Sequence, residues 1–234
     1  MRIALFGYGK MGKMIEGIAL NRGHEISARI DLGKAEDIDY NKIDLAIDFS
    51  VPEAAVANIE TALENGIPVV SGTTGWLDHY DHIVQRCDEL GGAFLYASNF
   101  SLGVNIFFAL NEYLAQKMSA LKQYGVSIEE IHHTQKQDAP SGTAITLAEG
   151  VLANTEYKNW RLGEAEDGEI PIVSKRIGNY AGTHTVDYDS SIDQIRIQHT
   201  AHSRKGFAEG AVIAAEWLLG KKGVFSMHDV LNLG

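Results

Sequence analysis

The sequence predicts an α/β fold in which a parallel sheet flanked by helices is interrupted by an inserted α+β domain built on a mixed sheet. Three observations support this prediction. Up to Asn99, short apolar runs alternate with stretches of helical spacing, as in right-handed βαβ units. After Asn99, strand-like runs follow one another with little helix between them, and an apolar helix at 208–219 could pack back on the first domain. We therefore expect one domain at 1–101 and 204–234 and a second at 102–203.

Five short apolar runs in the first domain are expected to form buried parallel strands. The segment after the first run has apolar residues at Met11, Ile15 and Ile18, which is helical spacing. Pro52 is tolerated in the first turn of the next helix, and Gly66 is a typical stop signal. The expected strands are 2–6, 25–30, 44–49, 67–70 and 93–96, and the expected helices are 10–21, 52–65 and 77–90.

The second domain combines helices with alternating strands. Residues 194–198 alternate with a period of two, as expected of a strand with one exposed face. The acidic stretch 164–169 is expected to be a solvated loop. The expected helices are 104–121 and 144–152, and the expected strands are 126–132, 171–177, 184–187 and 194–200.

Composition limits the partners that the chain can have. The 234 residues are 45% hydrophobic and carry a formal net charge of −11. That charge disfavours nucleic acid and anionic membranes, so an anionic substrate needs a local basic patch. The N-terminal apolar run is too short for a signal peptide and no run approaches the ~20 residues of a transmembrane helix, so we expect a cytoplasmic protein. The single cysteine, Cys87, falls in an expected helix and is expected to serve packing.

The first strand is followed by a glycine motif that is typical of dinucleotide-binding sites. Gly7-Tyr8-Gly9-Lys10-Met11-Gly12 fits G-x-G-x-x-G and opens a helix, and Asp31 ends the second strand about 20 residues on. These features predict a Rossmann-like cofactor domain, although a glycine-rich turn without a ligand remains an alternative. The charge of Asp31 favours NADH over NADPH, and Leu32 supplies no neighbouring cation. Lys34 and Lys10 keep NADPH open as a cofactor.

Two further turns are expected at the carboxyl edge of the same sheet, where ligands of open α/β sheets bind. Gly72-Thr73-Thr74-Gly75 follows the fourth strand and Ala97-Ser98-Asn99-Phe100 follows the fifth. Their small and hydroxyl residues could approach a nicotinamide and its ribose, or they could be ordinary strand-to-helix turns. The Y-x-x-x-K pattern at 113–117 resembles that of short-chain dehydrogenases, but the glycine spacing differs from theirs, so we expect a chance match.

The run 132–143 brings two imidazoles, an ammonium and a helix start within a dozen residues. His132, His133 and Lys136 can exchange protons near neutral pH. The Ser141-Gly142-Thr143 helix start offers backbone N–H groups to an anion. Histidines merely satisfied at a domain edge are the structural alternative. A metal site would need a third ligand such as His199 or His202, and the sequence has neither a cysteine cluster nor an H-E-x-x-H helix, so no metal is expected.

The segment from Glu130 to Ala144 resembles the signature of the 4-hydroxy-tetrahydrodipicolinate reductases, formerly called dihydrodipicolinate reductases. The similarity covers nearly the whole chain and includes the glycine motif, 47–50, 72–75, 99–105 and 203–204. The resemblance implies NAD(P)H-dependent reduction of a cyclic dicarboxylic imine, with loss of water, in the diaminopimelate route to lysine. It also implies a homotetramer formed through the sheets of the second domain.

Residue roles follow from the same resemblance. It implies that His132 is a proton donor or acceptor and Lys136 a proton donor, that His133 contacts substrate, and that Gly142 and Thr143 bind a substrate carboxylate. The residues that it places around the cofactor are Gly7, Tyr8, Gly9, Lys10, Met11, Gly12, Asp31, Phe49, Gly72, Thr73, Thr74, Ala97, Ser98, Asn99, Phe100 and Arg204.

Two departures and two rival functions remain. The segment 33–43 is short for the family, and Leu32 stands where the family often has a basic residue; both bear on cofactor preference. One rival is another nicotinamide enzyme of an amino-acid intermediate, such as a diaminopimelate or semialdehyde dehydrogenase. A semialdehyde enzyme needs a nucleophilic cysteine in a loop, which Cys87 does not provide. The other rival is a non-enzymatic protein that binds a dinucleotide without turnover.

Overall fold

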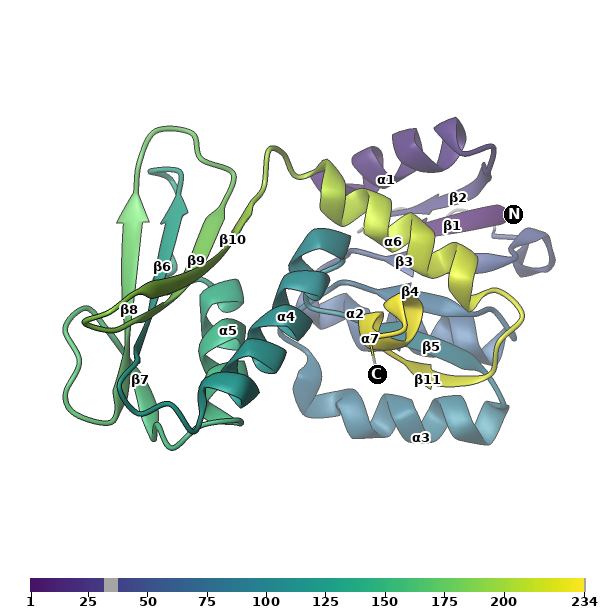
Figure 1. Cartoon of the computed structure of the whole chain (residues 1–234). Helices are drawn as coiled ribbons and strands as arrows, with labels where there is room; N and C mark the ends of the chain where they lie inside the picture. The colour runs from purple at the N-terminus through teal and green to yellow at the C-terminus, as the bar shows by residue number, and fades with distance from the viewer. Residues whose placement is uncertain (32–37, 234) are drawn as a thin grey trace. The chain divides into compact units, whose positions relative to one another are not determined.

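The computed structural model describes residues 1–31 and 38–233, and the chain forms two compact units (Figure 1). Met1–Leu102 and Lys205–Gly234 make the first unit, and Gly103–Arg204 makes the second. Leu32 and Lys34, which bear on cofactor preference, lie outside the described residues. Within the described ranges, no helix combines the length and the apolar character needed to cross a membrane.

The first unit is built on a parallel sheet of six strands in the order β11-β5-β4-β3-β1-β2. Helices lie on both of its faces (Figure 1). The strands are β1 (Arg2–Phe6), β2 (Glu25–Ile30), β3 (Leu45–Asp48), β4 (Val69–Ser71), β5 (Ala93–Tyr96) and β11 (Gly223–Phe225), and the helices are α1 (Lys10–Asn21), α2 (Pro52–Glu64), α3 (Tyr80–Leu90), α6 (Lys205–Leu218) and α7 (Met227–Leu231).

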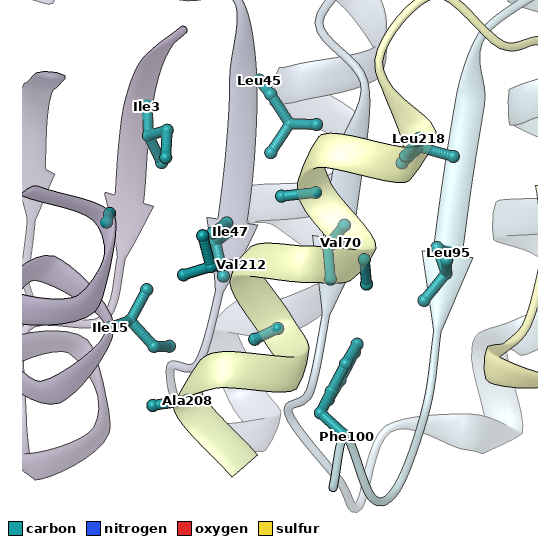
Figure 2. Packing of buried hydrophobic residues seen from close by; sticks show 14 of the residues in the cluster. Ile3, Ile15, Leu45, Ile47, Val70, Leu95, Phe100, Ala208, Val212 and Leu218 are labelled. Carbon is teal, nitrogen blue, oxygen red and sulfur yellow. The ribbon is translucent and has the colours of Figure 1, made fainter. Parts of the chain in front are cut away.

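Alternate residues of each strand supply two separate cores, because successive side chains of a strand point to opposite faces. Ile47 packs with Val212 of α6 and Ile15 of α1 on one face, as Figure 2 shows. Ala46 packs with Ile59 of α2 and the helix α3 on the other. A buried side chain of this size contributes about 1.5–3 kcal/mol, so both helical layers hold the sheet firmly.

α6 packs closely against the turn after β5 at Gly210. A Cβ atom at this position would lie 1.7 Å from the carbonyl oxygen of Phe100, so no other residue fits there without a shift of the backbone. The close approach holds Phe100, which is only 1% exposed, in the core beneath the turn that follows β5.

The second unit is built on a mixed sheet of five strands in the order β10-β9-β6-β8-β7. β6 runs parallel to β8 and antiparallel to β9. Two helices cover one face with Phe107, Leu147 and Val151, while Val173 on the opposite face remains substantially exposed. The elements are α4 (Leu102–Met118), β6 (Gly125–His132), α5 (Gly142–Leu152), β7 (Asn159–Leu162), β8 (Glu169–Arg176), β9 (Thr183–Asp189) and β10 (Gln194–Thr200).

The predicted fold class, a parallel sheet plus an α+β part on a mixed sheet, is confirmed. Four short elements of the described structure were absent from the sequence prediction: the 3₁₀ turn Tyr40–Lys42, β7, β11 and α7. β11 has three half-buried residues, too few to show a period, and exists because its backbone pairs with β5. The predicted helix 77–90 begins with a 3₁₀ turn, Leu77–His79, and the predicted loop 164–169 ends in β8.

Candidate active site

The glycine motif forms the turn between β1 and α1, and its three glycines do different things. Gly7 has φ +88°, and a Cβ there would lie 2.2 Å from the carbonyl oxygen of Phe49. A Cβ at Gly12 would lie 2.3 Å from the carbonyl oxygen of Gly7, so this glycine permits close helix–strand packing. A Cβ at Gly9 would meet no described atom within 4 Å. The first and third glycines are needed for packing, whereas the second leaves open space for a phosphate to approach the backbone.

A cavity of about 350 Å³ lies beside this turn and brings together residues that the sequence analysis grouped. Gly7, Gly9, Asp31 and Phe49 all line it, together with Asn58 of α2. Gly9 is the residue before α1, and no side chain within 1–31 or 38–233 caps that helix start. The amides of the first turn and their partial positive charge are thus available to an anion.

The lysine, the tyrosine and the methionine of the motif have different surroundings. Lys10 is exposed at the first position of α1, and Met11 packs against the core. The Tyr8 hydroxyl donates to Glu16, and the Arg29 guanidinium lies 5.7 Å from the centre of the Tyr8 ring. Tyr8 and Arg29 therefore form a surface stack beside the glycine turn.

Asp48, at the end of β3, ties the turn that carries Phe49 to the predicted cofactor turn after β4, a role that was not predicted from the sequence. The side chain is fully buried. Its Oδ2 accepts from the Thr73 hydroxyl at 2.7 Å, and its Oδ1 accepts from the Ser50 hydroxyl at 2.7 Å and from Asn58 at 3.0 Å. The Thr73 oxygen in turn accepts from the Ser50 amide at 2.9 Å. This network fixes the turn after β3 against the turn after β4.

Aromatic packing completes this edge of the first unit. Gly72 lies against the Phe49 ring so closely that a Cβ there would be 2.3 Å from a ring carbon. The rings of Phe49 and Phe100 lie 5.6 Å apart. In the turn after β5, Asn99 accepts from the Ser101 amide at 2.9 Å, Ala97 is half-buried and Ser98 is exposed, as is Thr74 in the turn after β4. Arg204 is exposed at the end of the second unit.

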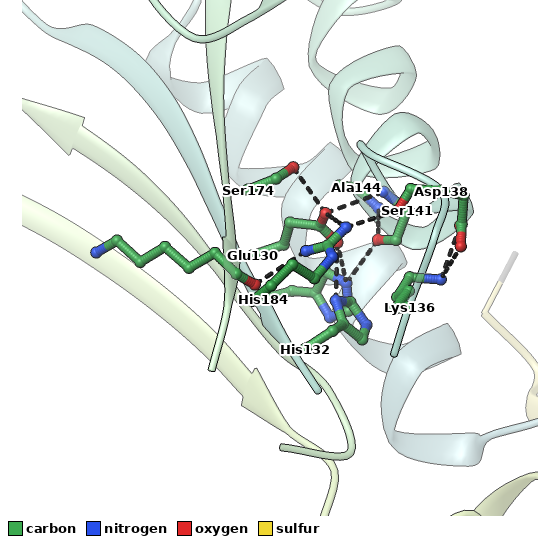
Figure 3. Close-up of polar contacts among 10 residues, drawn as sticks. Glu130, His132, Lys136, Asp138, Ser141, Ala144, Ser174 and His184 are labelled. Atoms are coloured by element: carbon green, nitrogen blue, oxygen red, sulfur yellow. Dashed lines mark hydrogen bonds and ion pairs between the residues drawn. The ribbon is translucent and has the colours of Figure 1, made fainter. Parts of the chain in front are cut away.

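In the second unit, the buried carboxylate of Glu130 lies beside the His132 ring (Figure 3). Glu130 and His132 stand two apart on β6, so both side chains are on its buried face. Glu130 Oε1 accepts from the Ser174 hydroxyl at 2.7 Å, the Arg176 guanidinium at 2.9 Å and the Ser141 amide at 3.2 Å. Its other oxygen, Oε2, lies 3.0 Å from His132 Nδ1, a distance typical of an ion pair but off the line of a regular hydrogen bond.

The surroundings keep Glu130 charged. Burial by itself raises the pKa of Glu130, but the contacts with His132, Ser141, Ser174 and Arg176 outweigh that effect and hold the pKa well below its ordinary value. A permanent negative charge therefore faces the buried side of the His132 ring at neutral pH.

His184 of β9 is a second buried imidazole in this cluster. Its ring centre lies 5.0 Å from that of His132, and its Nε2 lies 3.0 Å from the Ser141 hydroxyl. Burial, with a smaller contribution from His132, lowers the pKa of His184 to about 3. His184 is consequently neutral at physiological pH and adds no charge to the site.

The start of α5 and the loop before it carry the other predicted substrate residues. Ser141 caps α5 by accepting from the Ala144 amide at 3.2 Å. In the described part of the chain, the amides of Gly142 and Thr143 have no recorded partner, so this helix start can take an anion. Lys136 Nζ donates to both oxygens of Asp138 at 2.7 and 2.8 Å. His133 is half-buried, and its Nδ1 has no hydrogen-bond partner among the described residues.

The structure shows the surroundings of Cys87, of the Tyr113–Lys117 pair and of the residues that could bind a metal. Cys87 is fully buried, and burial raises the pKa of its thiol, which fits packing and not nucleophilic attack. Tyr113 is 60% exposed with Lys117 over its ring, a surface pair on α4. The three possible metal ligands that lie together within the described ranges are Glu130, His132 and His184, a group without His199 or His202. Arg176 already neutralises the carboxylate of that group, which disfavours a cation there.

Comparison with known proteins gives the same family for both units. Residues 1–100 match the family described as dihydrodipicolinate reductase, N-terminus, and residues 103–231 match dihydrodipicolinate reductase, C-terminus. The chain is 58% identical to a 4-hydroxy-tetrahydrodipicolinate reductase of Christiangramia forsetii, over 99% of this chain and 98% of the relative. It is 37% identical to a protein of the same name from Sulfurimonas denitrificans, over the whole of both chains.

A solved structure supports the fold. The dipicolinate-bound dihydrodipicolinate reductase of Paenisporosarcina sp. TG-14 matches with a TM-score of 0.78 at 23% identity, over 97% of both chains. The sequence matches and this shared fold agree with the resemblance inferred from the motifs. The chain belongs to the dihydrodipicolinate reductase family, a family of oxidoreductases with a dinucleotide-binding domain.

Proposed function

We propose that this chain reduces 4-hydroxy-tetrahydrodipicolinate to tetrahydrodipicolinate, with loss of water and at the expense of NADH or NADPH, in the diaminopimelate route of lysine biosynthesis. The observation that carries the proposal is the 58% identity over nearly the full length to a relative named for this reaction. The sites support it independently: the first unit has an open glycine turn for a dinucleotide, and the second has proton-exchanging side chains beside an uncapped pair of amides.

The first unit is assigned to the cofactor. Gly9 and the start of α1 take the pyrophosphate, and Asp31 takes the ribose hydroxyls at the mouth of the 350 Å³ cavity. The carboxylate of Asp31 repels a 2′-phosphate, so NADH is the preferred cofactor. The other assigned residues are Gly7, Tyr8, Lys10, Met11, Gly12, Phe49, Gly72, Thr73, Thr74, Ala97, Ser98, Asn99, Phe100 and Arg204. Phe100 and Thr73 are buried, so they shape the site from beneath.

The second unit is assigned to the substrate. The amides of Gly142 and Thr143 bind one carboxylate, and His133 contacts the same molecule. When bound, the reduced nicotinamide supplies the hydride. Lys136 donates the proton that balances the negative charge formed on the substrate, and His132 donates or accepts a proton. Binding of a dianion also gives the Lys136 ammonium a partner that can replace the exposed Asp138.

Assembly and location are further parts of the proposal. We assign the chain to the cytoplasm as a homotetramer formed through the second sheet. The uncovered face of that sheet supports the assembly, because the aliphatic Val173, which pairs with Glu129 on that face, is 41% exposed. Neither nucleic acid nor membrane is expected as a partner, given the net charge of −11.

The test is NADH consumption by the purified chain in the presence of freshly made substrate, with NADPH compared under the same conditions. The proposal predicts turnover with both cofactors and a higher kcat/KM for NADH. Dinucleotide binding without turnover would favour the non-enzymatic alternative. A strong preference for NADPH would refute the role given to Asp31.

A further inference from the structure

The two carboxylate oxygens of Glu130 have different surroundings. One accepts hydrogen bonds that hold the side chain in place, and the other faces two histidines. Oε1 accepts three hydrogen bonds, from Ser174 and Arg176 of β8 and from the Ser141 amide at the start of α5. These donors come from two different elements and prevent rotation of the carboxylate. Oε2 accepts no regular hydrogen bond within the described structure and faces His132 Nδ1 at 3.0 Å and His184 Nε2 at 3.7 Å (Figure 3).

We infer that Glu130 is a positioning residue that fixes the proton of neutral His132 on Nδ1 and so leaves Nε2 as the nitrogen that exchanges protons with substrate. This inference rests on the proposed function, in which His132 takes part in proton transfer. Glu130 is fully buried, so it acts through the imidazole and does not touch the substrate.

The assignment of the tautomer follows from which atoms face each other. Nδ1 is buried and lies 3.0 Å from a carboxylate oxygen that stays ionised. Two lone pairs at that distance would repel each other, whereas an N–H at Nδ1 is attracted to the oxygen and becomes more so when the ring is protonated. A buried carboxylate that orients a histidine and stabilises its imidazolium is the arrangement of catalytic triads.

The opposite side of the ring is kept open by Gly182. This glycine precedes β9 with φ +151°, and a Cβ there would lie 3.0 Å from His132 Nε2 and 3.4 Å from the neighbouring ring carbon. A side chain at this position would therefore press on the nitrogen that the inference assigns to proton exchange. The glycine leaves that nitrogen without a side chain pressed against it, in a residue that is 7% exposed.

The remaining charged or titratable groups around His132 do not compete for Glu130. His184 on β9 stays neutral, and Arg176 on β8 binds Oε1 and not Oε2. Lys136, on the loop between β6 and α5, is paired with Asp138. The negative charge on Oε2 is therefore directed at His132.

The test compares Glu130→Gln with the matched control Glu129→Gln. Glu129 is the preceding residue of β6, points the other way and pairs with Lys175 at the surface. The first readout is the ¹⁵N–¹H NMR spectrum of the histidine rings, with His132 assigned by its loss in His132→Gln. We expect the Nδ1–H tautomer in the wild type and in Glu129→Gln, and loss of that tautomer in Glu130→Gln.

The second readout is kcat with saturating NADH. We expect kcat to fall roughly 10²–10⁴-fold in Glu130→Gln, with an unchanged KM for NADH. A merely structural role would lower the amount of active enzyme and leave the Nδ1–H tautomer in place.

Two results would overturn the inference. One is an Nε2–H tautomer of His132 in the wild-type spectrum, which needs no turnover and does not depend on the folding of Glu130→Gln. The other is activity that a chelator abolishes and Zn²⁺ restores, because the same three side chains would then act as metal ligands. Absence of turnover in the wild type would instead refute the proposed function and leave the tautomer result standing.

Discussion

Removing the charge of Lys136 should lower turnover strongly and change the free energy of unfolding little. We expect Lys136→Met, which keeps the length of the side chain and removes the charge, to lower kcat roughly 10²–10⁴-fold, the usual effect of losing a general acid. That factor corresponds to about 2.7–5.4 kcal/mol of transition-state stabilisation. The folded structure loses far less, because the only pairing recorded for Lys136 in the described residues is with Asp138, whose side chain is 60% exposed. An ion pair of this kind contributes about 0–1 kcal/mol.

The assay is NADH oxidation at saturating substrate, alongside urea unfolding of the same preparations. Lys122→Met is the matched control, since Lys122 also pairs with an exposed carboxylate of the second unit, Glu156, at 2.6 Å. Both variants should unfold within about 1 kcal/mol of the wild type, and only Lys136→Met should lose turnover. Near-normal kcat in Lys136→Met would refute the assignment of Lys136 as the proton donor.

Three further predictions concern the cofactor, the core and the pH dependence of stability. Asp31→Ser removes the charge that repels a 2′-phosphate, so the ratio of kcat/KM for NADPH to that for NADH should rise at least about tenfold; an unchanged ratio would contradict the role of Asp31. Gly210→Ala places a Cβ 1.7 Å from the Phe100 carbonyl oxygen and should destabilise the fold by about 1–3 kcal/mol in urea unfolding, whereas Gly17→Ala, where a Cβ meets no described atom within 4 Å, should not. The folded-state pKa of His184, about 3, lies below the ordinary 6.5, so the unfolded chain binds the extra proton and stability should fall as the pH drops from 6.5 toward 3. His184→Gln should flatten that decline in urea midpoints, and an equally steep decline would contradict the assignment.

The parts of the fold that the sequence predicts best are those whose local pattern and tertiary packing agree. β1, α1, β2, β5 and β10 have the predicted bounds. β11 could not be found this way, because three residues carry no period and the strand depends on pairing with β5. α7 did leave a signal: Ser226 and Asp229 form a capping box, and their spacing is visible in the sequence.

The same distinction holds for the candidate sites. The residues of the glycine turn and Asp31 are close in the chain or follow a known spacing, so sequence patterns suffice to group them. Glu130 lay within the motif, and its two-residue separation from His132 already placed both on one face of a strand. His184 could not be connected to them, because it reaches the cluster only through the pairing of β9 with β6. The buried hub at Asp48 likewise depends on how β3 and β4 align.

Product formation by the purified chain tests the proposed reaction. NADH oxidation and tetrahydrodipicolinate formation would be followed together, starting from freshly prepared 4-hydroxy-tetrahydrodipicolinate. The proposed chemistry predicts one molecule of product for each NADH consumed, and loss of both signals in Lys136→Met. NADH that binds and is not consumed, or is consumed without this product, would contradict it.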